Sequence, residues 1–342
     1  MSSLKLGSTG GGSVLLTPAN SASHLTVTVP AVADTLAVQG QLGLRNKIIN
    51  GAMMIDQRNA GASVTLTAGS YTLDRWYCAS TASSKFSVQQ STTVPAGFKN
   101  SLLITSLSAY SVAATDRLNI QQVIEGFNIS DLSWGTANAK TITLSFQVYS
   151  SLTGTFSGAI QNADGNRSYP FTYSISSANS WTSISVTISG DTSGTWLTDN
   201  SGGITLIFSL GTGSTYSGAA GSWQAGNYKA VTGSVSVVGT NGATFYITGV
   251  QLEKGATATP FENRLYGTEL ALCQRYYLSA PHNSMVANQA AFYVSAQFPV
   301  TMRATPTVTT TATSSNLVAT TYGFSCTFGG QTGSGYAAAI EL

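Results

Sequence analysis

The feature that most limits the possible folds of this chain is a strict alternation of apolar and polar residues in many short runs. In residues 142–148, Ile, Leu, Phe and Val alternate with Thr, Ser and Gln, and residues 184–188 and 204–210 repeat the pattern. Because successive side chains of a strand point to opposite faces, each run predicts a strand with one buried face. The intervening NADGNR, SGDTSG, DNSGG and GTNGAT are rich in residues that tight turns favour. Strands and turns at this spacing predict an all-β fold, with a jelly-roll β-sandwich over residues 46–260.

The two flanking segments have a different character. Residues 1–45 contain Gly- and Ser-rich stretches and two short strand candidates, VLLT and HLTVTVP, but too few apolar residues for a core of their own. We therefore expect an extended N-terminal arm whose apolar residues are buried in an oligomer or against a partner: Leu4, Leu6, Val14, Leu15, Leu25, Val27 and Val29.

The C-terminal segment, residues 261–342, is expected to form a small, mostly-β tip domain. Leu270, Cys273 and Tyr277 recur at i, i+3 and i+7, which predicts one short helix capped by Thr268, with Glu269 in its first turn. Strand-like sequence returns after the helix, in AAFYVSAQFPV, PTVTTTAT and YGFSCTF.

Charge is scarce in this sequence. Only 8% of the residues are charged, against about 25% in a typical soluble domain. A surface of this kind is better tolerated when large areas are buried between identical subunits, so we expect an oligomer. The 15 basic residues do not form a run that could follow a phosphate backbone, which argues against nucleic acid binding. The sequence begins without an apolar signal segment and has no stretch of 18 apolar residues, so we expect assembly in a cytoplasm and no membrane insertion.

The residues that catalysis requires are sparse. The two histidines, His24 and His282, are far apart in sequence, and no G-x-S-x-G motif accompanies them. Asp191 and Asp199 are a conceivable glycosidase pair, but both lie in ordinary turn sequences. The three cysteines, at positions 78, 273 and 326, lack metal-ligand spacing and are expected to be free buried thiols. We predict no catalytic site and no cofactor.

Aromatic residues in polar loops are the candidates for binding a sugar. Their rings can stack on the apolar face of a sugar, while neighbouring polar groups bond its hydroxyls. The alternative is that the rings cover the ends of the sandwich core. Trp76 and Trp181, which lie in strand-like patterns, are expected to be core residues. The candidate sugar-binding residues are Trp134, Trp196, Asp199, Asn200, Tyr216, Trp223 and Gln224.

A joint is expected where the sandwich meets the tip. The stretch QLEKGATATPFENR concentrates charge in a chain that has little of it. Pro260 would end the last sandwich strand, Phe261 would fill the seam between the two domains, and Glu262 and Arg264 would make charge-assisted bonds across it. An ordinary turn with solvated charges is the alternative. The predicted joint residues are Glu253, Pro260, Phe261, Glu262 and Arg264.

The order FYITGVQLEKGATATPFENRLYGTELALCQRYY resembles the joint of bacteriophage and prophage tail-fibre, or receptor-binding, proteins. NKIINGAMMIDQR, YTLDRWYCAS, DLSWGTANAKTITLSFQVYSS and MRATPTVT fit the same family, so the resemblance covers residues 46–310. It implies an intertwined homotrimer in the virion, attached through its arm to phage tail or adaptor proteins and binding a host surface glycan. The sandwich is also similar to jelly-roll carbohydrate-binding modules. Many of these hold calcium, but Met54, Thr248 and Gly249 stand where the acidic ligands would be, so we predict no metal, with Glu253 as the remaining candidate ligand.

Two other functions remain open at this stage. The chain could be a non-adhesive fibre or decoration protein of the tail or head, or, with less support, a hydrolase of surface glycans. If the protein is adhesive, either the sandwich or the tip could touch the host. In the tip, the candidates are Tyr277, His282, Tyr293 and Tyr322.

Overall fold

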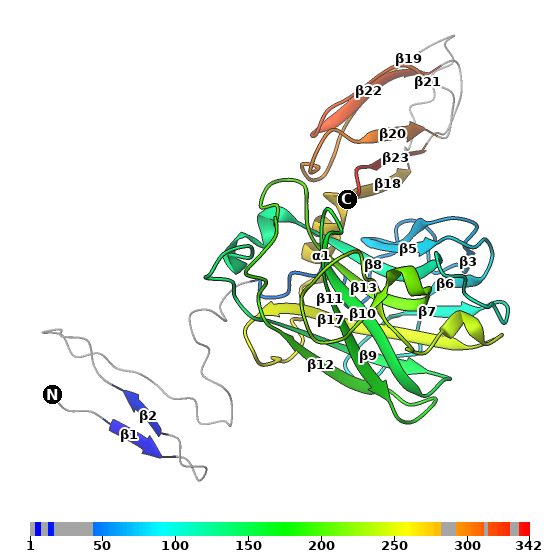
Figure 1. Ribbon diagram of the computed structural model, residues 1–342. Coiled ribbons are helices and arrows are strands. Elements are labelled where there is room, and N and C mark those ends of the chain that lie inside the picture. Colours follow the sequence, from blue (N-terminus) through cyan, green and yellow to red (C-terminus); the bar gives the residue numbers. More distant parts are fainter. Residues whose placement is uncertain (1–3, 8–12, 17–43, 282–291, 311–313, 329–334) are drawn as a thin grey trace, which may run out of the picture. The chain divides into compact units, whose positions relative to one another are not determined.

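The computed structural model describes residues 4–7, 13–16, 44–281, 292–310, 314–328 and 335–342 (Figure 1). Residues 1–43 and 44–342 form two compact units. In the first unit, β1 (Leu4–Gly7) and β2 (Ser13–Leu16) pair antiparallel, with Leu4 opposite Leu16. The candidate attachment residues Leu25, Val27 and Val29 lie outside the described residues, as do His24 and His282.

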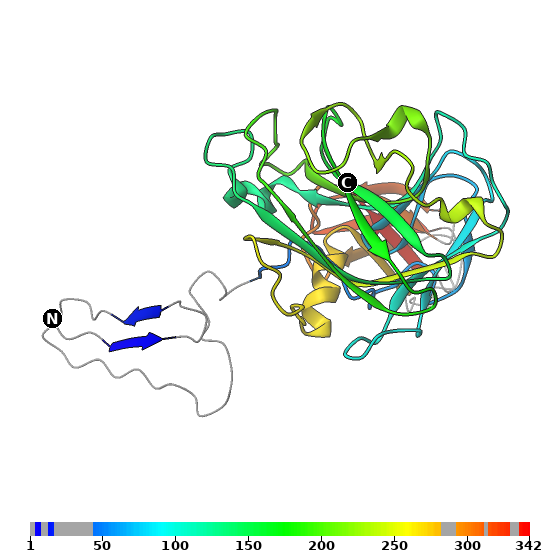
Figure 2. The same cartoon turned by 60° about the horizontal axis from the view of Figure 1, so that its bottom comes forward.

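The predicted β-sandwich is confirmed in the second unit. One antiparallel sheet has the order β15 (Gln224–Ala225), β11 (Arg167–Ile175), β10 (Gly154–Asn162), β13 (Gly202–Thr212), β8 (Arg117–Glu125), β5 (Trp76–Ser80), β4 (Ser70–Leu73). The other has the order β12 (Thr182–Ile188), β9 (Ile142–Ser150), β17 (Thr244–Lys254), β7 (Ser101–Ser106), β6 (Phe86–Ser91), β3 (Val64–Thr65). We call them the seven-stranded and the six-stranded sheet; they run as two layers in both views (Figures 1 and 2).

The core lies between these two layers, as the alternation predicts. Leu144, Phe146 and Val148 of β9 are buried, and the ring of Phe146 packs edge-on against Phe208 of β13, with 5.0 Å between the ring centroids. Trp76 is fully buried in the same core, as expected. Burying large apolar side chains from both layers supplies the main stabilisation of such a sandwich.

The turn sequences have two different roles. Asp164-Gly165 lies in the tight turn between β10 and β11, where Gly165 adopts a positive φ of 64°. The SGDTSG and DNSGG stretches, by contrast, do not close a hairpin. They belong to the connection between β12 and β13, which lie in different sheets. Short-range turn signals predict where a strand ends, but not which strand pairs next.

The described residues of the C-terminal segment form one helix and six strands, which confirms the expected mostly-β segment with one short helix. Helix α1 spans Tyr266–Gln274, and two three-stranded sheets follow: β18 (Tyr277–Pro281), β23 (Gly335–Ala339), β20 (Thr307–Thr310); and β19 (Phe292–Gln297), β22 (Gly323–Phe328), β21 (Ser314–Ala319). The predicted helix cap is wrong, because Thr268 lies inside the first turn and the N-cap is Leu265, without a side-chain cap bond. Tyr277 is also not helical, since it begins β18.

The segment is anchored to the sandwich by buried polar contacts that the sequence did not reveal. Arg75, in the turn directly before β5, is 1% exposed and pairs with Glu341 near the C-terminus. Its guanidinium also lies 3.6 Å from the ring centroid of Tyr276. Glu125, which is 2% exposed, accepts hydrogen bonds from Arg275 at 2.7 Å and from the Tyr276 hydroxyl at 2.6 Å. Residues 44–342 therefore form one unit, and the expected boundary at residue 260 falls inside it.

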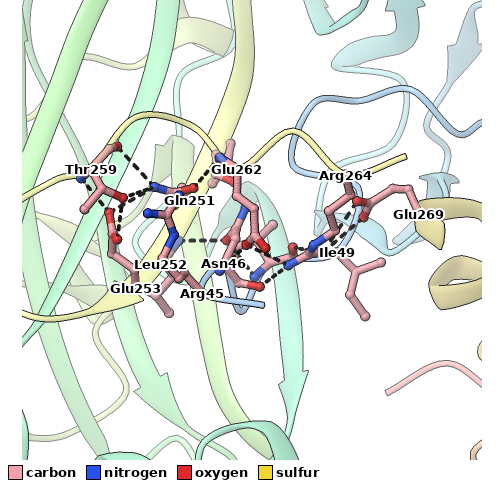
Figure 3. Close-up of polar contacts among 12 residues, drawn as sticks. Arg45, Asn46, Ile49, Gln251, Leu252, Glu253, Thr259, Glu262, Arg264 and Glu269 are labelled. Carbon is pink, nitrogen blue, oxygen red and sulfur yellow. Dashed lines mark hydrogen bonds and ion pairs between the residues drawn. The ribbon is translucent and has the colours of Figure 1, made fainter. Parts of the chain in front are cut away.

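The joint predicted at residues 251–264 is a dense polar network (Figure 3). Arg264, 5% exposed in its side chain, lies 3.6 Å from Glu262 and 3.4 Å from Glu269, and it donates to the backbone carbonyls of Asn46 and Ile48. Glu262 in turn accepts from the backbone N–H of Asn46 at 2.7 Å. The joint thus connects residues 46–48 to the last strand of the sandwich, β17, and to the start of α1.

Phe261 has a different position from the expected one. Its ring packs edge-on against Phe98, with 5.2 Å between centroids, so it covers the sandwich itself rather than a seam toward the C-terminal segment. The prediction that Pro260 ends the last sandwich strand is wrong, because β17 already ends at Lys254 and a loop separates it from Pro260. This placement brings two joint residues to the outer face of the six-stranded sheet.

Candidate functional site

A row of three aromatic rings crosses the outer face of the six-stranded sheet. Trp181, just before β12, lies beside Tyr149 of β9, and Tyr149 lies opposite Tyr246 of β17. The ring centroids are 5.6 Å apart in the first pair and 5.0 Å in the second. All three side chains are half-buried, so part of each ring reaches solvent. We call these three residues the aromatic row.

The strand period explains why the aromatic row lies outside. In β9, Leu144, Phe146 and Val148 face the core, so Tyr149 shares the outer face with Ser145 and Gln147. By the same period, Trp181 belongs with Ser183 and Ser185 rather than with the core-facing Ile184. The expectation that Trp181 is a core residue is therefore wrong. The sequence contained the signal, in the parity of position 181.

A groove adjoins the row on the same face. Its volume is about 270 Å³, and it is lined by Phe98, Ser145, Phe146, Gln147, Ser183, Ile184, Ser185, Gly249, Ala258, Thr259, Pro260 and Phe261. Ser183 donates to the side-chain oxygen of Gln147 at 2.9 Å, which joins the groove to the strands that carry Trp181 and Tyr149. None of the described residues that line the groove is charged.

A bulge in β17 shapes the groove. The register of β17 against β9 shifts between Thr248 and Gln251, and Gly249 takes a φ of 61° there. A Cβ at Gly249 would come within 2.6 Å of the Phe98 ring. Any residue other than glycine would therefore clash with the ring in its present position against the strand. Phe98 in turn supports Phe261.

The chemistry of this face suits a neutral polyol. Half-exposed rings offer apolar area, and the hydroxyls and amides beside them both donate and accept hydrogen bonds. The phenol of Tyr246 is protonated at neutral pH, as in any ordinary tyrosine, and burial, and then the neighbouring Tyr149, raise its pKa further. Among the described residues, the Trp181 indole N–H has no hydrogen-bond partner, which leaves a donor beside the groove.

Three of the predicted sugar-binding rings gather elsewhere, in a cluster at one end of the core. Trp134 and Trp196 are 6% and 8% exposed, with their centroids 4.6 Å apart, and Trp223 packs against both at 5.3 Å. Each indole N–H donates to a backbone carbonyl, of Lys140, Ser193 and Ser189 respectively. This burial favours the packing role that the sequence left open for Trp134 and Trp196.

The other predicted sugar-binding residues are dispersed. Asn200 exchanges hydrogen bonds with Arg303 and so belongs to the anchor of the C-terminal segment. Asp199 accepts from the backbone N–H of Ser201, which lowers the pKa of its carboxyl. Gln224 lies in the edge strand β15, and Tyr216 lies beneath the guanidinium of Arg117, 5.7 Å from it. The structure does not bring these residues together with the aromatic row, and their binding role stays a prediction.

The acidic residues that were weighed for catalysis or calcium have structural partners. Both oxygens of Asp191 accept from Arg167, at 2.8 and 2.6 Å. Glu253, which is 3% exposed, accepts from Gln251 and from both the backbone N–H and the hydroxyl of Thr259. Met54 packs against a small apolar cluster with Cys273. No group of three potential metal-ligating side chains occurs within the described ranges.

The three cysteines are free and buried, as expected. Burial raises the pKa of the Cys78 thiol to about 12, so this thiol stays protonated and unreactive. None of the helices in the described part of the chain is long and apolar enough to span a membrane.

Comparison with known proteins gives distant likenesses. No protein-family model matches the sequence, and no curated protein matches it. Among solved structures, the enzymatically active domain of tailspike protein 4 of bacteriophage CBA120 is 12% identical, with a TM-score of 0.33; the match covers 61% of this chain and 21% of that one. The carbohydrate-binding module TmCBM61 in complex with β-1,4-galactotriose is 9% identical, with a TM-score of 0.32, over 62% and 100% of the two chains.

A third likeness is of the same order. The family 11 carbohydrate-binding module of a Clostridium thermocellum cellulosomal cellulase is 15% identical, with a TM-score of 0.28, over 59% of this chain and 100% of that one. At such identities and TM-scores, the likenesses assign this chain neither a family nor a ligand.

Proposed function

We propose that this protein is a structural fibre of a bacteriophage virion, a tail fibre that attaches the particle to a glycan, such as lipopolysaccharide, on the bacterial surface. The sandwich supplies the glycan-binding surface, and the N-terminal arm attaches the fibre to tail or adaptor proteins. The protein acts by adhesion rather than catalysis. The observation that carries the binding role is the aromatic row beside an uncharged groove on the outer face of the six-stranded sheet.

The geometry of this face supports binding along a glycan chain. Tyr149 and Tyr246 lie on the adjacent strands β9 and β17, and Trp181 directly precedes β12, the neighbour of β9, so the three rings extend across the sheet. Hydroxyls and an amide of Ser145, Gln147, Ser183 and Ser185 continue the same surface into the groove. Aromatic area with convergent hydrogen-bonding groups is the usual composition of a site for an uncharged ligand.

Replacing Trp181 by Ala tests the site. We expect binding to a glycan found on an array of bacterial polysaccharides to weaken by about 1–3 kcal/mol, because the largest ring of the row is lost. The thermal unfolding midpoint should hardly move, since this ring lies outside the core. Trp181→Phe, which keeps an aromatic face, should retain most of the affinity.

Two outcomes would count against the proposal. If the full chain binds no glycan on the array, the non-adhesive fibre becomes the better interpretation. If it binds and Trp181→Ala binds equally well, the glycan site lies elsewhere. Release of reducing sugar from bound glycan would instead support the hydrolase.

The homotrimer is a second element of the proposal. It is supported by the 8% charged residues, and three copies of a weak site add to a strong hold. Light scattering on the full chain at micromolar concentration should give a mass about three times the 35.4 kDa of the chain. A stable monomer under these conditions would rule out the trimer.

A further inference from the structure

The outer face of the seven-stranded sheet is only partly covered. The chain between β13 and β17 crosses it with β14 (Ser217–Gly218), β16 (Ala230–Val231) and the 3-10 turn Ser214–Tyr216 (green to yellow-green in Figures 1 and 2). It is held to β10 and β11 through the hydroxyl of Ser157, which bonds Val231 and Ser234, and that of Ser168, which bonds Gly226. The cover leaves a pocket over β5 and β8.

This pocket has a volume of about 190 Å³. It is lined by Gly69, Tyr77, Ala79, Ser80, Thr81, Arg117, Asn119, Gln121 and Lys229. Pockets for drug-sized ligands run from about 300 to 1,000 Å³, so this one suits a single small unit rather than a chain. Its lining differs from that of the groove on the other sheet, because it contains two cations.

The two cations are not neutralised by the protein. Lys229 is 9% exposed, and its ammonium donates to the side-chain oxygen of Gln161 at 2.8 Å, which leaves two of its three donors without a partner among the described residues. Burial and the nearby Arg117 lower the pKa of Lys229 to about 8, so it remains mostly protonated at neutral pH. Arg117 forms no ion pair within the described part of the chain, and its guanidinium lies 5.7 Å from the ring centroid of Tyr216.

The carboxylate next to Arg117 in sequence, Asp116, is bonded by neutral donors and is not paired with Arg117. Asp116 accepts hydrogen bonds from the Tyr110 hydroxyl at 2.6 Å, from the Ala113 backbone N–H at 2.8 Å and from the Thr81 hydroxyl at 2.9 Å. The residues that line the pocket include no acid. A largely buried Lys229 beside Arg117, with no carboxylate in the lining, therefore favours an anion between the two cations.

A second observation points to a ligand that also donates a hydrogen bond. Asn119 is fully buried, and its amide nitrogen donates to the side-chain oxygen of Gln121 at 3.0 Å. The amide oxygen of Asn119 has no hydrogen-bond partner among the described residues. An unpaired buried acceptor is costly, and a ligand hydroxyl would satisfy it.

We propose that this pocket binds the carboxylate-bearing unit of an acidic glycan, with the carboxylate at Arg117 and Lys229 and a sugar hydroxyl at the amide oxygen of Asn119. The half-buried ring of Tyr77 flanks the sugar. The site is distinct from the aromatic row, which lies on the other sheet, and it does not depend on the attachment function. A chain with both sites would bind an acidic polysaccharide twice: a neutral stretch of sugars at the aromatic row, and a carboxylate-bearing sugar unit in the pocket.

Calorimetric titration of the full chain tests the assignment. The methyl glycosides of glucuronic and galacturonic acid are compared with those of glucose and galactose, which differ only in the carboxylate. We expect at least one uronate to bind at least tenfold more tightly than its neutral counterpart. Arg117→Gln should reduce that uronate affinity at least tenfold, whereas Lys140→Gln, which removes an exposed cation outside the pocket, should change it less than twofold.

Further arms of the experiment keep the outcome decisive. Lys229→Gln should reduce the uronate affinity as Arg117→Gln does. If the substitution of the buried Lys229 impairs folding, the variant at the exposed Arg117 still tests the proposal. Trp181→Ala should leave uronate binding intact, so the two sites are tested separately. Equal affinity for uronates and neutral glycosides, no binding of either, or an unaffected Arg117→Gln variant would overturn the proposal. Binding of inorganic phosphate as tight as that of the uronate would also overturn it, in favour of a simple anion site.

Discussion

Replacing Arg75 by Met is expected to lower the free energy of unfolding by about 3–5 kcal/mol, the usual cost of removing one partner of a buried ion pair. Arg75 is 1% exposed and pairs with Glu341, which lies 266 residues away in sequence. It also donates to the backbone carbonyl of Val123 and lies over the Tyr276 ring. Its loss leaves the Glu341 carboxylate with Arg58 alone, at 2.7 Å.

Guanidinium-induced unfolding, followed by tryptophan fluorescence, measures this effect. Arg117→Met is the matched control, because it removes an exposed arginine with no ion pair and should cost less than about 0.5 kcal/mol. The double variant Arg75→Met/Glu341→Gln removes both partners, and its loss compared with the sum of the two single variants gives the coupling energy of the pair. If Arg75→Met behaves like Arg117→Met, the C-terminal end is not anchored as described.

Replacing Trp196 by Ala is expected to destabilise the sandwich by about 3–5 kcal/mol, the range for truncating a large buried aromatic residue. The ring is 8% exposed and packs edge-on against Trp134, and its N–H donates to Ser193. Glycan affinity of the folded protein should be unchanged. This is the opposite of the result expected for Trp181→Ala, which should lose affinity and keep stability.

The two tryptophan variants together distinguish a core ring from a binding ring. Thermal melting and glycan binding are measured on the same preparations. If Trp196→Ala melts like the wild type but no longer binds, the cluster of Trp134, Trp196 and Trp223 is the binding surface after all. The aromatic row would then be a packing feature of the sheet.

The alternating pattern was enough to predict strands and a sandwich, because the apolar–polar alternation of a half-buried strand is visible in the local sequence. It also contained the side of the sheet on which Trp181 lies, since position 181 has the parity of Ser183 and Ser185. The sequence did not show that Tyr149 and Tyr246 lie beside Trp181. That neighbourhood depends on the order β12-β9-β17, in which strands far apart in the chain are adjacent.

The ion pairs that anchor the C-terminal segment could not be predicted either, because they also join residues far apart in the chain. Nothing local to Arg75 or Glu125 indicates that their partners are Glu341 and Arg275. The joint was easier to find, because its charges stand out in a chain with few of them, and charge-assisted bonds of Glu262 and Arg264 were predicted there. The hydrogen bond from the backbone N–H of Asn46 to Glu262, 216 residues further along the chain, was not predicted.

The most direct test of the account is a crystal structure of the full chain with the oligosaccharide selected on the glycan array. We predict density for the sugar chain on the outer face of the six-stranded sheet, with one ring against Trp181 and hydroxyls within hydrogen-bond distance of Gln147 or Ser183. Sugar density over the Trp196 and Trp223 cluster, or beside Tyr293 and Tyr322 in the C-terminal segment, with the aromatic row unoccupied, would contradict it.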